Sequence, residues 1–281
     1  MEPTLFESTG VFESPLLKES SGIAVSRRQP GVLWTHNDSS DGPHLYATNL
    51  QGADLGFFRI SGADAVDWED IALGPCPTDT PGGECLYIAD TGDNRERREG
   101  VVIYIMEEPA DVPGAGRWRE YGGQVRRLVI RYPDGPQDVE AMAVDTAGNL
   151  LLVSKGRSGP IKLYRVAANS VRAEATEARP VPGFELVPRR SLGRLATGAA
   201  VSPGGSQLAV RTYTEIVFFN WDGQRATPRG LPCFLGIREP QGEAIDFLDE
   251  ETLVLTSESR SGFRGGLSRV RCPDGLAEGD S

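Results

Sequence analysis

The amino-acid sequence predicts an all-β protein that folds as one five-bladed β-propeller over residues 1–281, and three observations lead to this prediction. Stretches that favour helix are scarce, whereas 34 glycines and 20 prolines are spread along the chain, as expected where many short strands are joined by tight turns. A chain of this length can bury a large core, and closed all-β folds of this size are commonly one domain. The third observation is a short apolar phrase that recurs five times.

The recurring phrase is predicted to form the innermost strand of each blade. Its copies begin at residues 21, 69, 140, 197 and 243, so that successive copies are 48, 71, 57 and 46 residues apart. This spacing fits four-stranded blades with loops of varying length. The small apolar residues of the phrase suit strands that crowd around a central axis. The copies are Ser21–Val25, Glu69–Leu73, Glu140–Val144, Thr197–Val201 and Glu243–Phe247.

Further apolar runs follow each inner strand, and we assign them to the outer strands of the blades. Second strands are predicted at Val32–Thr35, Leu86–Ala89, Leu150–Ser154, Gln207–Val210 and Thr252–Thr256. Third strands are predicted at His44–Thr48, Val101–Met106, Ile161–Val166, Ile216–Asn220 and Gly266–Val270. Fourth strands are predicted at Gly56–Ile60, Gln124–Arg131, Phe184–Val187 and Cys233–Ile237.

The fifth blade lacks a fourth strand, because the chain ends in the polar segment Leu276–Ser281, which we expect to be a disordered tail. The segment Leu5–Glu13 can supply the missing strand. It would close the ring by joining the two ends of the chain, which leaves no open sheet edge. The alternative is a six- or seven-bladed ring with fewer strands per blade, since the 71-residue second repeat could hold an extra sheet.

Polar residues gather at one mouth of the predicted channel. An inner strand starts on the face where the antiparallel second strand ends, so both sets of residues meet there. Inner-strand starts contribute Glu19, Ser21, Asp67, Glu69, Asp138, Glu140, Thr197, Gln241 and Glu243. Second-strand ends contribute His36, Asn37, Asp38, the loop Asp90–Asn94, Lys155, Arg211 and Glu258.

The gathering of carboxylates predicts a metal site. Glu69, Glu140 and Glu243 occupy the same repeat position, and like charges around a narrow axis are costly unless a cation neutralises them. Because oxygen donors dominate, calcium, or else magnesium, fits better than zinc or copper. The candidate ligands are Glu19, Asn37, Asp38, Glu69, Asp90, Asp93, Asn94, Glu140 and Glu243. Alternatively no metal is bound, and the carboxylates cap loop amides or pair with Lys155 and Arg211.

Four cysteines predict two disulfides. None has zinc-like spacing, and Cys76 and Cys85 flank a turn rich in proline and glycine, which leaves Cys233 to pair with Cys272. Such pairing implies an oxidising compartment. We therefore expect a periplasmic or secreted protein whose signal peptide is missing from the sequence that begins at Met1. The alternative is a cytosolic protein with four free thiols.

The net charge of −11 argues against nucleic acid and anionic membrane surfaces as partners, since both would be repelled. No apolar run approaches the roughly 20 residues that span a bilayer. The expected partner is a small molecule, and the protein is expected to be a monomer.

Several phrases resemble those of a bacterial family of secreted or lipid-anchored propeller proteins, most of which have no assigned function. They are Trp34–Asp38, Asp67–Ala72, Leu86–Asn94, and Tyr132–Gly135 followed by Asp138–Ala141. The resemblance covers most of the chain and implies the propeller fold and an extracytoplasmic compartment, but no reaction.

A more distant analogy, at the level of the fold, is to the calcium-dependent propeller hydrolases of the lactonase, paraoxonase and organophosphatase group. These enzymes hold their metal with Glu, Asn and Asp side chains at the channel mouth, and most have six blades. Comparable positions here are Glu19 or Ser21, Asn37, Asp90 and Asn94. The sequence motifs of that group are absent from this chain.

Two classes of function follow. The first is a calcium-dependent hydrolase of an activated ester, lactone or phosphotriester, in which Glu69 or Glu140 activates water or attacks directly and His36 carries the proton. Lys155 and Arg211 would stabilise the developing negative charge. A glycosidase that uses two of the carboxylates is compatible with the same residues. The second class is a non-catalytic binding or interaction propeller in which the metal holds the blades together, and the absence of a GxSxG nucleophile motif is compatible with it.

Overall fold

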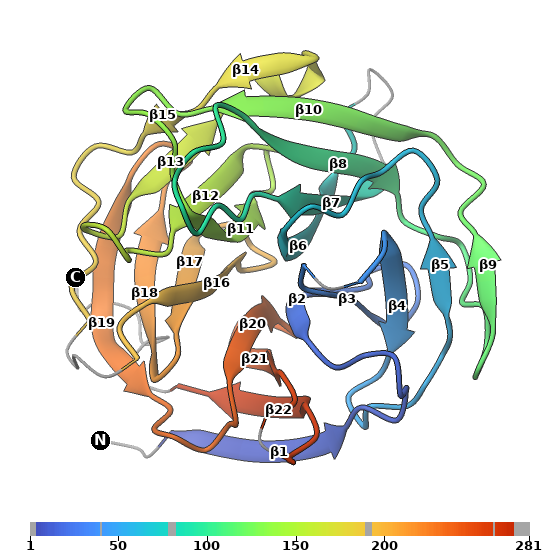
Figure 1. The fold of residues 1–281 in the computed structure, drawn as a ribbon. Coiled ribbons are helices and arrows are strands. Elements are labelled where there is room, and N and C mark those ends of the chain that lie inside the picture. Colours follow the sequence, from blue (N-terminus) through green and yellow to red (C-terminus); the bar gives the residue numbers. More distant parts are fainter. Residues whose placement is uncertain (1–3, 40, 78–82, 189–192, 261, 273–281) are drawn as a thin grey trace.

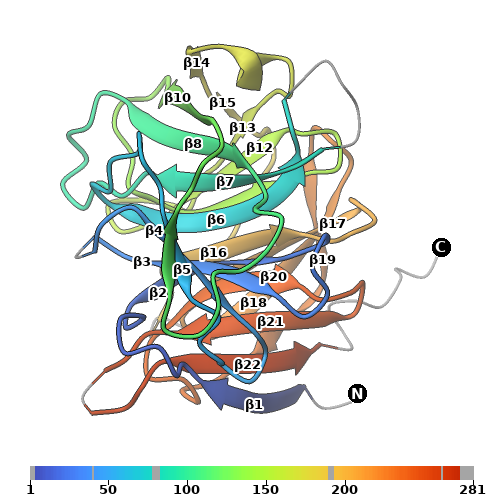
Figure 2. The ribbon, with the colours of Figure 1, turned by 90° about the vertical axis from the view of Figure 1, so that its right-hand side faces the viewer.

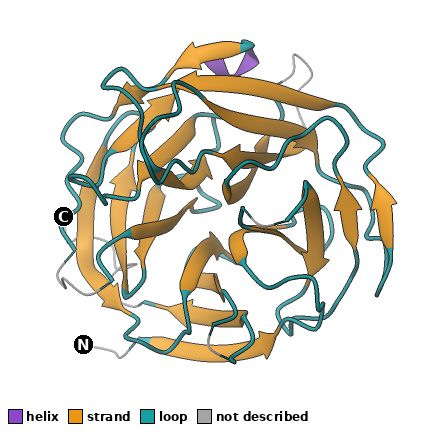
Figure 3. Cartoon of the chain, viewed as in Figure 1, coloured by secondary structure: helices purple, strands orange, loops and turns teal. Residues whose placement is uncertain are grey.

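A computed structural model describes residues 4–39, 41–77, 83–188, 193–260 and 262–272. In these ranges the chain forms β-strands and one 3-10 turn, Ser170–Arg172, and the strands build five sheets arranged as blades around an axis (Figures 1 and 3). The predicted five-bladed propeller is therefore confirmed. The predicted tail, Leu276–Ser281, lies outside the described residues.

Each blade has its strands in chain order from the axis outward. Blade one holds β2 (Ser20–Val25), β3 (Leu33–Asn37), β4 (His44–Thr48) and β5 (Phe57–Arg59). Blade two holds β6 (Trp68–Pro75), β7 (Glu84–Asp90), β8 (Val101–Glu107) and β10 (Val125–Arg131), and blade three holds β11 (Val139–Val144), β12 (Leu150–Ser154), β13 (Leu163–Val166) and β15 (Arg179–Pro180). Blade four holds β16 (Ala196–Val201), β17 (Gln207–Thr212), β18 (Glu215–Trp221) and β19 (Ala226–Phe234).

Blade five closes the ring with both ends of the chain. Its strands β20 (Gly242–Phe247), β21 (Thr252–Ser257) and β22 (Gly266–Arg271) are completed by β1 (Leu5–Val11). β1 runs antiparallel to β22, with Leu5 opposite Arg271 and Val11 opposite Gly266. Figures 1 and 2 show the two strands side by side, as the sequence predicts.

Two of the predicted fourth strands were wrong. In blade three the outer strand is β15, whereas Phe184–Val187 contributes an isolated bridge between Ile161 and Leu186. In blade four the outer strand starts at Ala226 rather than at Cys233. Both observed strands are largely exposed and contain proline, which an edge strand tolerates because one of its edges faces solvent. A search for apolar runs in the sequence therefore does not locate these outer strands correctly.

Two short strands have no counterpart in the predicted pattern. β9 (Trp118–Glu120) lies parallel to β5 of blade one, and β14 (Ala175–Glu177) lies parallel to β10 of blade two. The long second repeat thus contains a strand that reaches back to blade one, and not an additional blade (Figure 1).

The hydrophobic core is divided among the five interfaces between blades. Trp34 and Leu45 of blade one pack with Leu86 and Ile88 of blade two, for example, and the other four clusters likewise each join two neighbouring blades. Along a middle strand such as β7 or β12, successive side chains point alternately toward the two neighbouring blades. These strands are therefore buried on both faces.

Both predicted disulfides are confirmed. Cys76–Cys85 joins the residue that follows β6 to β7 within blade two, and Cys233–Cys272 joins blade four to the residue that follows β22 in blade five. Two disulfides are typical of proteins from an oxidising, extracytoplasmic compartment. Among the described residues no helix is long and apolar enough to cross a membrane.

Candidate functional site

A break in strand pairing marks the start of every inner strand. In blade two the pairing passes from Trp68 and Asp90 to Asp70 and Ala89, which leaves Glu69 without a partner residue across the ladder. The corresponding break leaves out Ser21, Glu140 and Thr197 in blades one, three and four, and Glu243 together with Ala244 in blade five. A β-bulge re-aims the side chain of the extra residue. Because the bulge recurs at one repeat position, the five side chains converge at one end of the channel.

We call this end the acidic mouth. It comprises the bulged residues together with the residues that flank them and those that follow the second strands. Its ionisable members are Glu19, Asp38, Asp67, Glu69, Asp138, Glu140, Lys155, Tyr213, Glu243 and Glu258.

Three carboxylates form the tightest group within the acidic mouth. Asp38 follows β3, and Asp67 and Glu69 lie at the start of β6; one oxygen from each lies within 4.8 Å of the others. Gly92 leaves room for them, because a Cβ at that position would collide with Glu69 Oε1 and Asp67 Oδ2. The glycine of the Asp90–Asn94 loop is therefore required by the close approach of two carboxylates.

Lys155 places an ammonium group inside the acidic mouth. Its Nζ lies 2.5 Å from Glu140 Oε1, and both side chains are at least 90% buried. Burial alone would lower the pKa of Lys155, but the neighbouring carboxylates of Glu140, Glu69 and Asp138 outweigh burial and raise it. Lys155 therefore stays charged and offsets part of the negative charge.

Burial and the remaining negative charge raise the pKa values of the carboxyl groups in the mouth. Burial, aided by the repulsion of neighbouring carboxylates, raises the pKa of Glu258 to about 8 and that of Asp67 to about 6. Burial raises the pKa of Glu140 to about 8 despite Lys155, and that of Glu243 to about 7. Burial and the charge of Glu140 raise the pKa of Glu69 well above its usual range. Around neutral pH the mouth therefore favours the uptake of protons or of a cation.

Apart from Glu140 Oε1, which pairs with Lys155, two buried oxygen atoms in the mouth have no hydrogen-bond partner among the described residues. Thr197 Oγ1 occupies in blade four the bulge position that glutamates occupy in blades two, three and five. Asp138 Oδ2 has only Arg157 Nε nearby, at 3.7 Å. Buried oxygens are normally hydrogen-bonded, so these two atoms have the capacity to bond water or another polar guest.

Four of the sequence-predicted ligands serve instead as a framework around the mouth. Asn37 Oδ1 accepts hydrogen bonds from the backbone N–H of Lys18 and Glu19, both at 2.9 Å. Asp90 pairs with Arg98 at 2.9 Å. Asp93 accepts from the N–H groups of Arg97 and Arg98, and Asn94 accepts from Arg157. These oxygens hold the loops, so we leave the four residues out of the ligand set.

Glu19 lies at the rim of the mouth, where its charge helps to raise the pKa of Asp38 and of Glu258. It is half-buried. Glu140 and Glu243 lie in the mouth as predicted, beyond the group formed by Asp38, Asp67 and Glu69.

His36 lies between blades one and two. Its ring is fully buried, makes an edge contact with Trp68 at a centroid distance of 5.5 Å, and places Nδ1 2.9 Å from the carbonyl oxygen of Asn37. Burial lowers the pKa of His36 to about 4. A neutral imidazole sealed from water does not suit the role of proton carrier.

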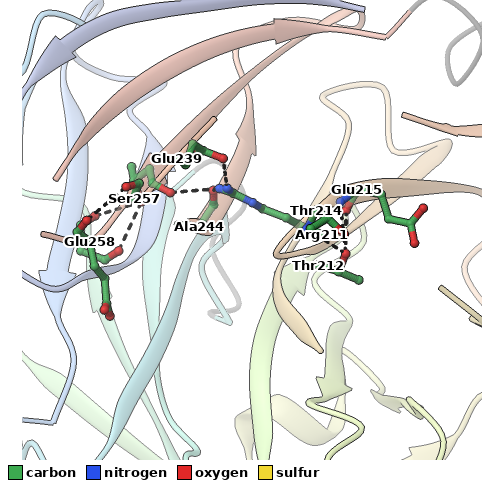
Figure 4. A network of polar contacts seen from close by, with 10 residues as sticks. Arg211, Thr212, Thr214, Glu215, Glu239, Ala244, Ser257 and Glu258 are labelled. Carbon is green, nitrogen blue, oxygen red and sulfur yellow. Dashed lines mark hydrogen bonds and ion pairs between the residues drawn. The ribbon is translucent and has the colours of Figure 1, made fainter. Parts of the chain in front are cut away.

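Arg211 binds blade four to blade five (Figure 4). Its Nη1 donates to the carbonyl oxygens of Ala244, at 2.6 Å, and Thr256, at 3.0 Å, and its Nη2 pairs with Glu239. The side chain is fully buried, and a Cβ at Gly242 would collide with Nη2. Arg211 thus has a structural role in this arrangement.

Sequence reasoning missed Tyr213. It follows β17 as Asp38 follows β3 and Lys155 follows β12, and this shared position is the signal that could have identified it. Burial and the charges of Glu243, Glu140 and Glu258 raise the pKa of its phenol, which therefore remains a hydrogen-bond donor in the mouth.

No family model matches the chain, and no curated protein matches it in sequence. Solved structures do share its fold. The PQQ-bound aldose sugar dehydrogenase of Streptomyces coelicolor is 13% identical, with 95% of this chain and 98% of that chain covered and a TM-score of 0.51. A luciferin-regenerating enzyme is 13% identical, with 96% of each chain covered and a TM-score of 0.51. A gluconolactonase of Xanthomonas campestris is 16% identical over 96% of this chain and 90% of that chain, with a TM-score of 0.49. At these identities the likeness concerns the fold alone.

Proposed function

We propose that the protein is a divalent-cation-dependent hydrolase of activated esters, lactones or phosphotriesters, with its active site in the acidic mouth. The observation that carries this proposal is the convergence of Asp38, Asp67 and Glu69, whose oxygens lie within 4.8 Å of one another. Carboxylate oxygens suit calcium or magnesium. The unsatisfied Thr197 Oγ1 and Asp138 Oδ2 support a guest at the same place. The neighbours named as a dehydrogenase and a luciferin-regenerating enzyme agree with an enzymatic use of the fold, but with no particular reaction.

The residues of the mouth divide into three roles. Asp38, Asp67 and Glu69 would hold the cation, which when bound polarises a carbonyl or phosphoryl oxygen. Glu140 exchanges a proton with water, because a pKa of about 8 is well matched to acid–base work near neutral pH. The Lys155 ammonium, held by Glu140, donates to the oxygen on which negative charge develops. His36 and Arg211 take no part, since both are sealed between blades.

A non-catalytic binding propeller is the second candidate. The ion pair between Lys155 and Glu140 favours it, because the protein already supplies one cation that offsets the charge of the mouth. A divalent ion would then hold blades together rather than act on a substrate.

The test combines cation binding with turnover. Calorimetry with calcium and with magnesium measures binding, and a panel of activated esters, lactones and phosphotriesters is assayed with cation and with chelator. We expect binding, and hydrolysis that chelator abolishes. Glu140→Gln should lower kcat by about 100-fold or more with little change in cation affinity, since general acid–base catalysis contributes about that much.

A matched pair of glycine variants tests the ligand group. Gly92→Ala should weaken cation binding by about tenfold or more, because the new Cβ displaces two ligands. Gly159→Ala, where a Cβ meets no atom within 4 Å, should leave binding unchanged. Cation binding without turnover of any substrate would favour the binding propeller, and absence of cation binding would contradict the hydrolase and the structural ion alike.

A further inference from the structure

The end of the channel opposite the acidic mouth contains an apolar cavity of about 300 Å³. It lies where the five inner strands end, and every blade contributes to its wall, for example through Ile23, Leu73, Val144, Val201 and Phe247. Alanines at other positions of these strands leave the space open. The volume lies at the lower limit of small-molecule sites, which are mostly apolar with a few polar groups.

Asp70 separates this cavity from the acidic mouth. It follows Glu69 of the mouth and precedes Ile71 of the cavity wall, and it is fully buried. Its two oxygens accept hydrogen bonds from the backbone N–H groups of Ile71 and Met142, both at 2.8 Å. The bonded carboxylate thus lies between a residue of the mouth and one of the cavity wall, and no described residue of the acidic mouth lines the cavity, which we call the chamber.

Asp246 on β20 presents a carboxylate to the chamber. It lines the cavity and keeps accessible surface, although it lies deep within the ring. Its oxygens accept from the N–H groups of Val25, at 2.7 Å, and Phe247, at 2.8 Å, which leaves acceptor capacity on each oxygen. Burial raises the pKa of Asp246 to about 6, so the group is ionised at pH 8.

Arg27 is the basic residue that borders the chamber, but its guanidinium group reaches outward. Its Nη1 lies 3.4 Å from Glu84 Oε1, and its side chain is 43% exposed. The described wall therefore combines a mostly apolar surface with the carboxylate of Asp246, on which the charge of Arg27 acts without an ion pair between these two described residues. A carboxylate in apolar surroundings is stabilised by a counter-charge.

We propose that this chamber is a binding site for a small organic cation, with an apolar body against the inner strands and a primary ammonium group paired with Asp246. Shape and charge both support this occupant: the wall is mostly apolar, and of the two charged residues that line it Asp246 presents its carboxylate to the chamber while the guanidinium group of Arg27 is directed outward to Glu84. The site is independent of the reaction proposed for the acidic mouth.

Three six-carbon probes of equal shape test the proposal. Hexylammonium, hexanol and hexanoate are titrated calorimetrically at pH 8 with calcium present. Hexylammonium should bind at least about tenfold more tightly than hexanol, because a charge-assisted hydrogen bond is about twice as strong as a neutral one. Hexanoate should not bind.

Two variants locate the binding. Asp246→Asn should reduce hexylammonium binding to the level of hexanol. Ala72→Leu should abolish the binding of both, because Ala72 is a half-buried residue of the chamber wall and a larger side chain fills the space. Thermal melting of both variants verifies that they fold, and Ala72→Leu remains informative if Asp246→Asn does not fold.

The carboxylates of the acidic mouth could also attract an ammonium ion, and Glu69→Gln controls for this. Hexylammonium binding that persists in Glu69→Gln and is lost in Ala72→Leu supports the chamber. Binding that survives Ala72→Leu, equal affinity for hexanol and hexylammonium, or no binding of any probe at millimolar concentration would each overturn the proposal.

Discussion

At the scale of single residues, the acidic mouth depends on a balance between burial and charge. Burial raises the pKa of Glu140, Glu243 and Glu258, while Lys155 opposes the rise from within the cluster. One buried ammonium group thereby stabilises several carboxylates, although within the described part of the chain its one ion pair is with Glu140.

Replacing Lys155 by methionine should destabilise the fold by about 3–5 kcal/mol, because a buried carboxylate is left without its counter-charge. Urea unfolding at pH 8 in chelator measures the change. The double variant Lys155→Met with Glu140→Gln should recover part of the loss. Arg269→Met removes a pair with Glu7 in which both side chains are at least half exposed, and it should cost no more than about 1 kcal/mol. If the single and double Lys155 variants unfold alike, the two residues are not coupled.

The raised pKa values also predict how stability depends on pH. Asp67, Glu243, Glu140 and Glu258 have folded-state pKa values of about 6, 7, 8 and 8, well above those of unfolded carboxyl groups. The folded state therefore binds protons more tightly than the unfolded state, and stability is lost as the pH rises through about 6 to 8.

In chelator, the urea midpoint should accordingly fall as the pH rises to about 8 and then level off. Each proton that the folded state holds and the unfolded state has lost changes the free energy of unfolding by about 1.4 kcal/mol per pH unit. Calcium should flatten this dependence, because a bound cation replaces the protons. A midpoint that rises with pH in chelator would contradict the assigned pKa directions.

At the scale of the elements, the same repeat position forms a β-bulge in all five blades. The bulge at the start of each inner strand turns a buried side chain toward the mouth, whether it is glutamate, threonine or serine. The apolar residues of the repeated phrase predict the inner strand. They do not predict the bulge, because the bulge depends on how the inner strand pairs with its neighbour.

The closing strand β1 makes a testable contact with blade one. A Cβ on Gly10 would collide with the backbone carbonyl of Gln51, which follows β4. Gly10→Ala should therefore destabilise the ring by about 1–3 kcal/mol, the usual cost of overpacking, as measured by urea unfolding. Gly122→Ala, at a position where a Cβ meets no atom within 4 Å, provides the control. Equal stabilities for the two variants would show that β1 has room to move.

At the scale of the whole molecule, the blades are joined across their interfaces by different means. Apolar clusters occupy all five interfaces, Arg211 and the Cys233–Cys272 disulfide join blades four and five, and Asp70 bonds blade two to blade three. Arg211 and the disulfide thus reinforce the interface between blades four and five, next to the place where the ring is closed.

The two disulfides should contribute unequally to stability. Cys233–Cys272 spans 39 positions in sequence and Cys76–Cys85 spans 9. On the chain-entropy account, replacing both cysteines of the longer loop by serine should cost about 4 kcal/mol, against about 3 kcal/mol for the shorter. Thermal unfolding of the two double variants measures this difference, and a larger loss from the shorter loop would contradict the account. Alkylation of the denatured, unreduced protein should label no cysteine.

The sequence by itself determined the five blades, the inner, second and third strands, the closing strand and both disulfides. The strands are encoded by apolar runs and the Cys76–Cys85 disulfide by a local turn, while the Cys233–Cys272 pair follows because two cysteines remain. The outer strands were partly missed because edge strands are polar and contain proline.

Only the tertiary structure decided which polar residues share the mouth. Asn37, Asp90, Asp93 and Asn94 read as ligands in the sequence, but backbone N–H groups and arginines from neighbouring loops engage their oxygens. His36 and Arg211 are sealed between blades, whereas Tyr213 lies at the mouth. The physical reason is that strand pairing only brings a residue near the channel. The bulge, the packing of the next blade and the available hydrogen-bond partners then decide whether its side chain points into the mouth.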